Sequence, residues 1–209
     1  MWHVEFRAED ACHTFDETDA LPAGASQEAL FFLDTTPPAI TISSPAAGAV
    51  FDTDDVSSIQ YSVDDGPLGS GVASHSVTFD GAPATNGQAL DMFFLDPGAH
   101  TIVVTAADNL GNAGSQTRTF EVHATSESLG NNLDRAWRLG LIDKQGIYNS
   151  LKAKVEAALR AHERGQHHVE HNVLGAFVNE LEAQRGKAVD VETANRFIAY
   201  AQDLIERGE

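Results

Sequence analysis

Short runs in which every second residue is hydrophobic follow one another between residues 38 and 122. Each run stops at a cluster of Gly, Pro, Asp or Asn, which is typical of β-strands with one buried face. The alternating positions are Ile40 and Ile42; Ile59, Tyr61 and Val63; Val77 and Phe79; Ile102, Val104 and Ala106; and Phe120 and Val122. Together with the segments AGAVF and LDMFF, these runs predict about seven strands in an antiparallel β-sandwich.

From residue 126 the hydrophobic period changes to that of a helix. Four apolar stripes follow: Leu129, Leu133, Trp137 and Leu141; Ile147, Leu151, Val155 and Leu159; Val169, Val173, Phe177 and Leu181; and Ala194, Phe197, Ile198, Ala201, Leu204 and Ile205. Asp143 and Asp190 stand at predicted N-caps, and Gly165, Gly186 and Gly208 follow three of the helices as C-terminal stops. The pattern predicts a small four-helix antiparallel bundle.

The chain also contains an internal repeat. VEFRAEDA at residues 4–11 aligns with IVVTAADN at residues 102–109, so residues 1–33 are predicted to be the last strands of a truncated preceding domain. Between the two copies, Asp34-Thr35-Thr36-Pro37-Pro38 has the composition of a stiff joint, because each proline fixes one φ angle. We therefore predict a β-domain over residues 34–124 and a helical domain over residues 125–209.

Charge supports the boundary near Ala124. The 209 residues include 31 acidic and 13 basic side chains, for a formal net charge of −18. Residues 1–124 carry 18 of the acidic and 2 of the basic residues, whereas residues 125–209 carry 13 and 11. A surface with this excess of negative charge repels nucleic acid and anionic membranes. We expect neither as a partner, and no apolar run approaches the roughly 20 residues of a membrane span.

Catalytic motifs are missing from the sequence. It contains no G-x-S-x-G, P-loop, HExxH or dinucleotide-binding fingerprint. The serine of Gly69-Ser70-Gly71 is better explained as part of a turn between two strands. We therefore predict that the chain is not an enzyme and that its chemistry is limited to binding.

Oxygen-bearing side chains follow several predicted strands of the β part. Asp34 opens the proline joint, Asp64 and Asp65 end a strand, and Asp108, Asn109 and Asn112 lie in the turn after another. If these turns converge on one rim, they would offer the oxygen ligands that Ca²⁺ prefers, and calcium is our only candidate cofactor. Asp and Asn are also turn formers that need no metal, and on sequence alone that explanation is preferred.

Four histidines, His162, His167, His168 and His171, crowd the predicted corner between the second and third helices. His167 and His171 are four residues apart and would share a helix face, as a zinc pair does. The stripe through Val169, Val173 and Phe177 places that face opposite the core. We therefore interpret them as solvent-facing histidines.

Two segments resemble known bacterial families. Residues 34–123, with the DTTPP joint, the SGV step at 70–72 and the A-x-D-N-x-G-N turn at 106–112, are similar to bacterial Ig-like repeats of large exported proteins. Residues 126–207, with GLID at 140–143, AFVN at 176–179 and QRGK at 184–187, resemble the FIMAH-type helical domain found near the C-terminus of extracellular bacterial enzymes. These resemblances imply a multidomain all-β plus all-α chain: an antiparallel Ig-like β-sandwich followed by the helical bundle.

They also imply a location and a role. We expect an extracellular or cell-surface protein region that is non-catalytic and spaces, presents or attaches the catalytic domain of a larger secreted bacterial enzyme. Its partners would be that catalytic domain and a polysaccharide or other cell-surface component. The alternative is that these are the terminal stalk modules of a calcium-stabilised surface adhesin. The sequence upstream of these modules separates the two hypotheses.

Overall fold

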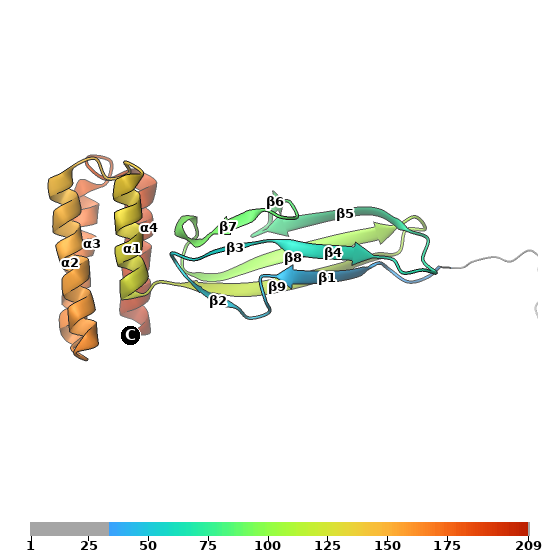
Figure 1. The fold of residues 1–209 in the computed structure, drawn as a ribbon, viewed down its shortest axis with the longest axis horizontal. Helices are drawn as coiled ribbons and strands as arrows, with labels where there is room; N and C mark the ends of the chain where they lie inside the picture. Colours follow the sequence, from blue (N-terminus) through green and yellow to red (C-terminus); the bar gives the residue numbers. More distant parts are fainter. Residues whose placement is uncertain (1–33, 209) are drawn as a thin grey trace, which may run out of the picture. The chain divides into compact units, whose positions relative to one another are not determined.

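The computed structural model describes residues 34–208, which belong to one compact unit. Strands fill the first part of this unit and helices the second (Figure 1). The strand-to-helix change falls between His123 and Ser126, where the hydrophobic period changes in the sequence. The predicted remnant of a preceding domain, residues 1–33, lies outside the described residues.

The strands form three sheets. In a five-stranded sheet the order is β2-β9-β8-β5-β6, and two-stranded sheets pair β1 with β4 and β3 with β7. The bounds are β1 Ala39–Ser44, β2 Val50–Asp52, β3 Val56–Ser58, β4 Gln60–Asp64, β5 Val72–Phe79, β6 Ala82–Ala84, β7 Ala89–Asp91, β8 Gly98–Asp108 and β9 Ala113–His123.

The predicted fold class, an antiparallel Ig-like β-sandwich followed by a four-helix antiparallel bundle, is wrong. The five-stranded sheet is mixed, because β2 runs parallel to β9, with Phe51 opposite Val122. The described residues therefore combine a mixed sheet, two short antiparallel sheets and four helices in one α/β unit. The error has a physical cause, since alternation reports which face of a strand is buried but not the direction of its neighbour.

The alternating positions do mark the core between the sheets. Ten residues form it: Ile42, Ile59, Tyr61, Val77, Leu90, Met92, Ile102, Val104, Phe120 and Val122. Eight of the ten are among the predicted alternating positions. The segment LDMFF departs from the prediction, because it forms the end of β7 and then a 3₁₀ turn, η1, over Met92–Phe94. The side chain of Asp91 caps this turn by accepting a hydrogen bond from the Phe93 N–H.

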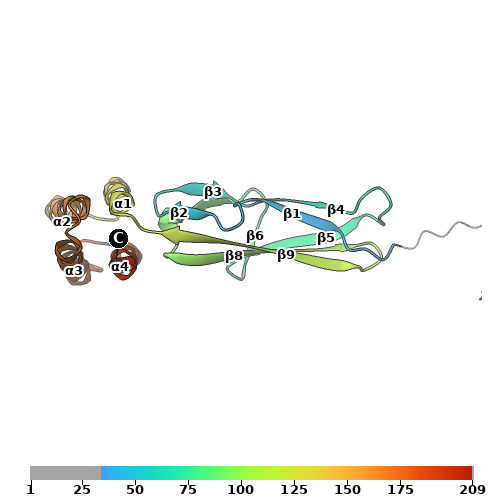
Figure 2. The ribbon, with the colours of Figure 1, turned by 90° about the horizontal axis from the view of Figure 1, so that it is seen from below.

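The helices are α1 Ser126–Arg138, α2 Gln145–Glu163, α3 His167–Gln184 and α4 Val191–Arg207. Each packs on the next in sequence, and α1 also packs on α4 (Figure 2). Asp190 is the N-cap of α4, as predicted, and its side chain accepts from the Thr193 N–H. Asp143 is not the N-cap of α2. The helix begins at Gln145, so Lys144 is its N-cap, and the Lys144 side chain makes no capping hydrogen bond.

The four helix stripes face the helical core largely as predicted, including Phe177 and Leu181 of α3, but the first turn of α3 is rotated relative to its predicted stripe. Val169 is 47% exposed, whereas Glu170 is fully buried beside Leu174 and Phe177. The buried face of α3 therefore begins at a carboxylate rather than at a valine. This rotation determines how the histidine corner is built.

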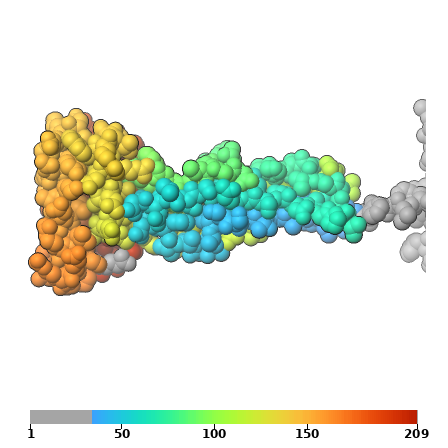
Figure 3. All heavy atoms as spheres, in the orientation of Figure 1, coloured from blue at the N-terminus to red at the C-terminus, as the bar shows by residue number. Residues whose placement is uncertain are grey.

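The η1 turn joins the strands to the helices. Phe93 is fully buried and belongs to the helical core, with its ring 6.2 Å from that of Phe197. The Tyr200 hydroxyl donates to the Phe93 carbonyl at 2.7 Å, and Arg135 of α1 makes a two-pronged ion pair with Asp91. The strands and α1 are in contact in the space-filling view (Figure 3).

Independent folding of the two parts stays a prediction. Residues 34–124 and 125–209, expressed separately, should each melt cooperatively, with β and helical circular dichroism respectively. Compared with the whole chain, the helical piece should lose more stability than the β piece does, because its core loses the side chain of Phe93. The predicted boundary is wrong if neither piece gives a cooperative melt.

Candidate functional site

Three carboxylates from distant segments meet at one end of the sheets. Asp34 precedes β1, Asp65 follows β4, and Asp108 is the last residue of β8. Each offers a carboxylate oxygen, and these oxygens all lie within 4.8 Å of one another. This is the end of the strands away from the helices, where β1 begins and β4 and β8 end (Figures 1 and 2).

The loop from residue 64 to residue 71 bends back to bring Asp65 into this cluster. The Gly71 N–H donates to Asp65 Oδ2 at 2.7 Å, and Gly71 has a φ of +91° that favours glycine. Gly69 passes so close to Asp65 that a Cβ there would lie 2.0 Å from the Asp65 carbonyl oxygen. The shape of the loop therefore requires glycine at positions 69 and 71.

The β8–β9 turn fixes Asp108 in the same way. Its Oδ1 accepts from the backbone N–H groups of Leu110 and Asn112, both at 2.8 Å, as an aspartate that organises a turn does. Asp108 is buried. The turn-forming role that the sequence suggested for this residue is present, and it leaves part of the acceptor capacity of the carboxylate unused.

Asp34 links the proline joint to the loop after β4. Its Oδ1 accepts from the Thr36 N–H and hydroxyl, and its Oδ2 accepts from the Ser70 N–H at 2.8 Å. The hydrogen bonds from the backbone of Thr36 and then of Ser70 hold the pKa of Asp34 well below its usual range. Asp34 therefore stays ionised, which is the form that binds a cation.

The other predicted ligands have different roles. The Asn112 side chain donates to the Asp34 carbonyl and to Asp108 Oδ2, and the Asn109 side chain donates to the Ser70 carbonyl at 2.7 Å. Both amides thus position the cluster from outside. Asp64 accepts from the Gly66 N–H and is not one of the three converging carboxylates.

The cluster has unused acceptors and no cationic side chain. Asp65 Oδ1 and the Ser70 hydroxyl are buried and have no hydrogen-bond partner within residues 34–208. No ion pair to Asp34, Asp65 or Asp108 is formed by the described part of the chain. Three carboxylates this close repel one another, and a bound cation would remove that repulsion.

Carboxylate oxygens are ligands that hard cations prefer. Ca²⁺ takes about six to eight oxygen ligands at about 2.3–2.6 Å and tolerates irregular geometry, which suits carboxylates that come from three different segments. Mg²⁺ requires near-octahedral geometry, with bonds of about 2.0–2.1 Å, and usually keeps several waters. The cluster offers oxygen atoms of the kind that coordinate a cation, and the Ser70 hydroxyl contacts no base among residues 34–208 that could activate it.

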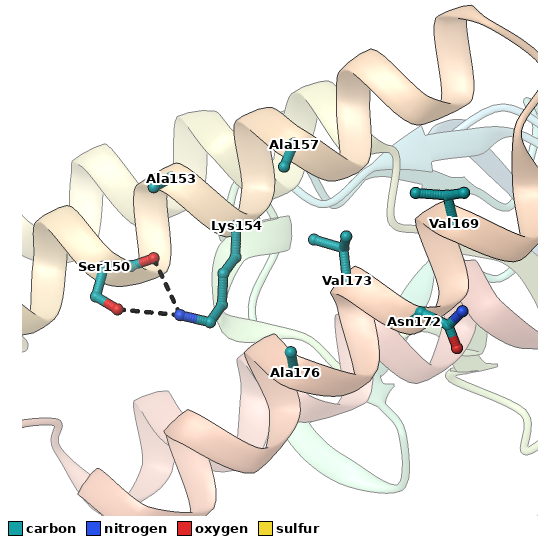
Figure 4. Close-up of a pocket in the computed structure, with 8 residues that line it drawn as sticks. All are labelled: Ser150, Ala153, Lys154, Ala157, Val169, Asn172, Val173 and Ala176. Carbon is teal, nitrogen blue, oxygen red and sulfur yellow. Dashed lines mark hydrogen bonds between the residues drawn. The ribbon is translucent and has the colours of Figure 1, made fainter.

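A shallow groove of about 460 Å³ lies between α2 and α3 (Figure 4). Small and apolar side chains line most of it, and the Lys154 ammonium at its edge donates to the Ser150 hydroxyl and to Glu180. The groove therefore offers an apolar surface without a set of catalytic groups.

No helix in the described chain has both the length and the apolar character needed to cross a membrane.

Comparison with known proteins places the chain in no family. No family model matches it, and no curated protein is significantly similar. Among solved structures, the endo-beta-1,4-mannanase from Thermotoga petrophila aligns with 15% sequence identity over 44% of this chain and 21% of that chain. The TM-score of this alignment is 0.36, which is too low to carry an argument about fold or activity.

Proposed function

We propose that the chain is a non-catalytic accessory region of a larger secreted bacterial enzyme, and that a calcium ion held by Asp34, Asp65 and Asp108 stiffens the joint before β1. The observation that carries the calcium proposal is the convergence of these three carboxylates at that joint. The accessory role rests on the sequence resemblances and on the missing catalytic motifs. The alternative, that these are stalk modules of a calcium-stabilised surface adhesin, would use the same calcium ion at the same joint.

The joint is already packed on the β8–β9 turn before any ion is added. The Asn112 amide donates to the Asp34 carbonyl, and a Cβ on Gly114 would lie 3.3 Å from the Pro37 side chain. An ion that contacts all three carboxylates would tie this segment to the loop after β4 as well. Such an ion would fix the direction in which the chain enters the sheet.

Calcium is expected to raise the melting temperature of the protein, and a chelator is expected to reverse the effect. An ion that binds only the folded state stabilises it by about 2.7 kcal/mol at 100 times its Kd. For a chain of this size that corresponds to a shift of about 5–11 °C. The shift in melting temperature is measured in thermal melts with calcium, with magnesium and with a chelator, all at the same ionic strength.

Asp65→Asn is the sharpest variant for this test, because Asp65 Oδ1 has no hydrogen bond to lose within residues 34–208. It should abolish the calcium shift, as should Asp108→Ala. The matched control is Asp64→Asn, the neighbouring carboxylate outside the cluster, which should keep the shift. Equal melts with calcium and with chelator in the unmodified protein would leave these residues as turn formers only.

A further inference from the structure

A second cluster lies at the corner between α2 and α3. It consists of His162 near the end of α2, His167 at the start of α3 and Glu170 one turn into α3. Each offers one nitrogen or oxygen atom, and these atoms all lie within 4.8 Å of one another. The solvent-facing interpretation holds for His167 and His168, which are exposed, but Nε2 of His171 is buried and has no hydrogen-bond partner within residues 34–208. Glu170, on the first turn of α3, points inward.

Glu170 is the unusual member of this cluster. Its carboxylate is fully buried, and burying an ionised carboxylate is costly unless charge and hydrogen bonds compensate it. The hydroxyl of Ser126, the first residue of α1, donates to Glu170 Oε1 at 3.2 Å. Among residues 34–208 neither Lys nor Arg pairs with Glu170, and the imidazoles of His162 and His167 face its other oxygen.

The distances around Glu170 Oε2 match those between ligands of one zinc ion. His162 Nδ1 lies 3.3 Å and His167 Nδ1 lies 3.5 Å from this oxygen. Tetrahedral ligands about 2.0–2.2 Å from Zn²⁺ are separated by about 3.3–3.6 Å. The two rings meet nearly edge to face, with centroids 5.9 Å apart, and one nitrogen of each ring lies within 4.8 Å of the other and of the carboxylate oxygen.

The surroundings also resemble those of a zinc site. The Ser126 hydroxyl fixes the second oxygen of Glu170, as outer hydrogen bonds commonly do for metal-binding carboxylates. The side chains of His162 and His167 are 40% and 50% exposed, so an ion can enter from solvent and keep a water as its fourth ligand. Three helix ends, those of α1, α2 and α3, meet at this point.

We propose that His162, His167 and Glu170 bind a zinc ion that fastens the ends of α1, α2 and α3 together. The ion supplies the positive charge that the buried carboxylate otherwise lacks. This site is separate from the carboxylate cluster in ligand type and in position, and neither proposal depends on the other.

Zinc binding is tested by calorimetric titration of the whole, untagged protein with Zn²⁺, in the presence of millimolar Ca²⁺ so that the carboxylate cluster is occupied. The unmodified protein should bind one equivalent of Zn²⁺ with a micromolar or lower Kd. Zinc should also raise the melting temperature followed by the helical circular dichroism signal. His162→Ala and His167→Ala should each weaken binding by at least about 100-fold, and Ser126→Ala by about 10- to 100-fold.

The matched control is His168→Ala, because His168 is an exposed neighbour that bonds only to Asn172 among the described residues. It should bind zinc as the unmodified protein does. Circular dichroism of each variant before titration shows whether it is folded, and Glu170→Gln, which keeps the shape of the side chain, tests the carboxylate. The proposal is overturned if no equivalent of zinc binds, or if His167→Ala and His168→Ala behave alike.

Discussion

Phe177→Ala should lower the free energy of unfolding by about 3–5 kcal/mol, as expected for removing a large side chain from a packed core. Phe177 is fully buried in the middle of α3, and its ring lies edge to face with that of Phe197 at 6.3 Å. The four helices share one core, so the cavity would border several of them. Urea denaturation followed by circular dichroism at 222 nm measures the loss.

Val169→Ala is the matched control for Phe177→Ala. Both residues lie on α3, and the apolar stripe in the sequence places both in the core. The structure leaves Val169 exposed, so its truncation should change the free energy of unfolding by no more than about 0.5 kcal/mol. A loss above about 1 kcal/mol for Val169→Ala would contradict the rotation of α3 and, with it, the inward position of Glu170.

The burial of individual strand residues could be predicted because alternation and burial share one physical cause. Ile102 and Val104, for example, were expected to face the core and are fully buried. The pairing of β2 with β9 could not be predicted in this way. β2 has three residues, and a parallel neighbour far along the chain leaves no mark on its pattern.

The predicted α3 stripe is wrong only at its first residue, because Val169 is exposed, whereas Phe177 and Leu181 are fully buried and Val173 packs against the core. Glu170, Leu174, Phe177 and Leu181 follow a helical spacing of four, three and four, and all are buried. The same spacing was present in the sequence. A glutamate in register with an apolar stripe, next to histidines in the sequence, was the available signal for the second cluster.

For the calcium candidate, the sequence indicated the turns but not the roles of their residues. Strand ends that share a rim bring their turns together, and this explains why Asp34, Asp65 and Asp108 meet. The amides of Asn109 and Asn112 donate rather than accept, and the direction of an amide depends on contacts from distant segments. Which of Asp64 and Asp65 joins the cluster likewise depends on the path of the loop through Gly69 and Gly71.

Phe93→Ala is expected to lower the free energy of unfolding by about 3–5 kcal/mol as well, although Phe93 lies in η1 after β7 rather than in one of the four α-helices. Its ring is fully buried in the helical core, and the guanidinium groups of Arg135 and Arg196 lie 4.9 Å and 5.3 Å from its centre. Cation–π contacts of this kind add to the apolar contribution. Truncation would therefore weaken the packing of the strands on α1 and α4 together.

Phe94→Ala separates this role from a general effect on the η1 turn. Phe94 is the next residue in η1 and is 53% exposed, so its loss should be small beside that of Phe93. Calorimetric melts of the two variants measure the difference. In Phe93→Ala the helical and β signals should melt at more separated temperatures than in the unmodified protein, because the side chain that couples the two parts is gone. Equal losses in the two variants would show that η1 acts through its turn geometry and that Phe93 does not couple the strands to the helices.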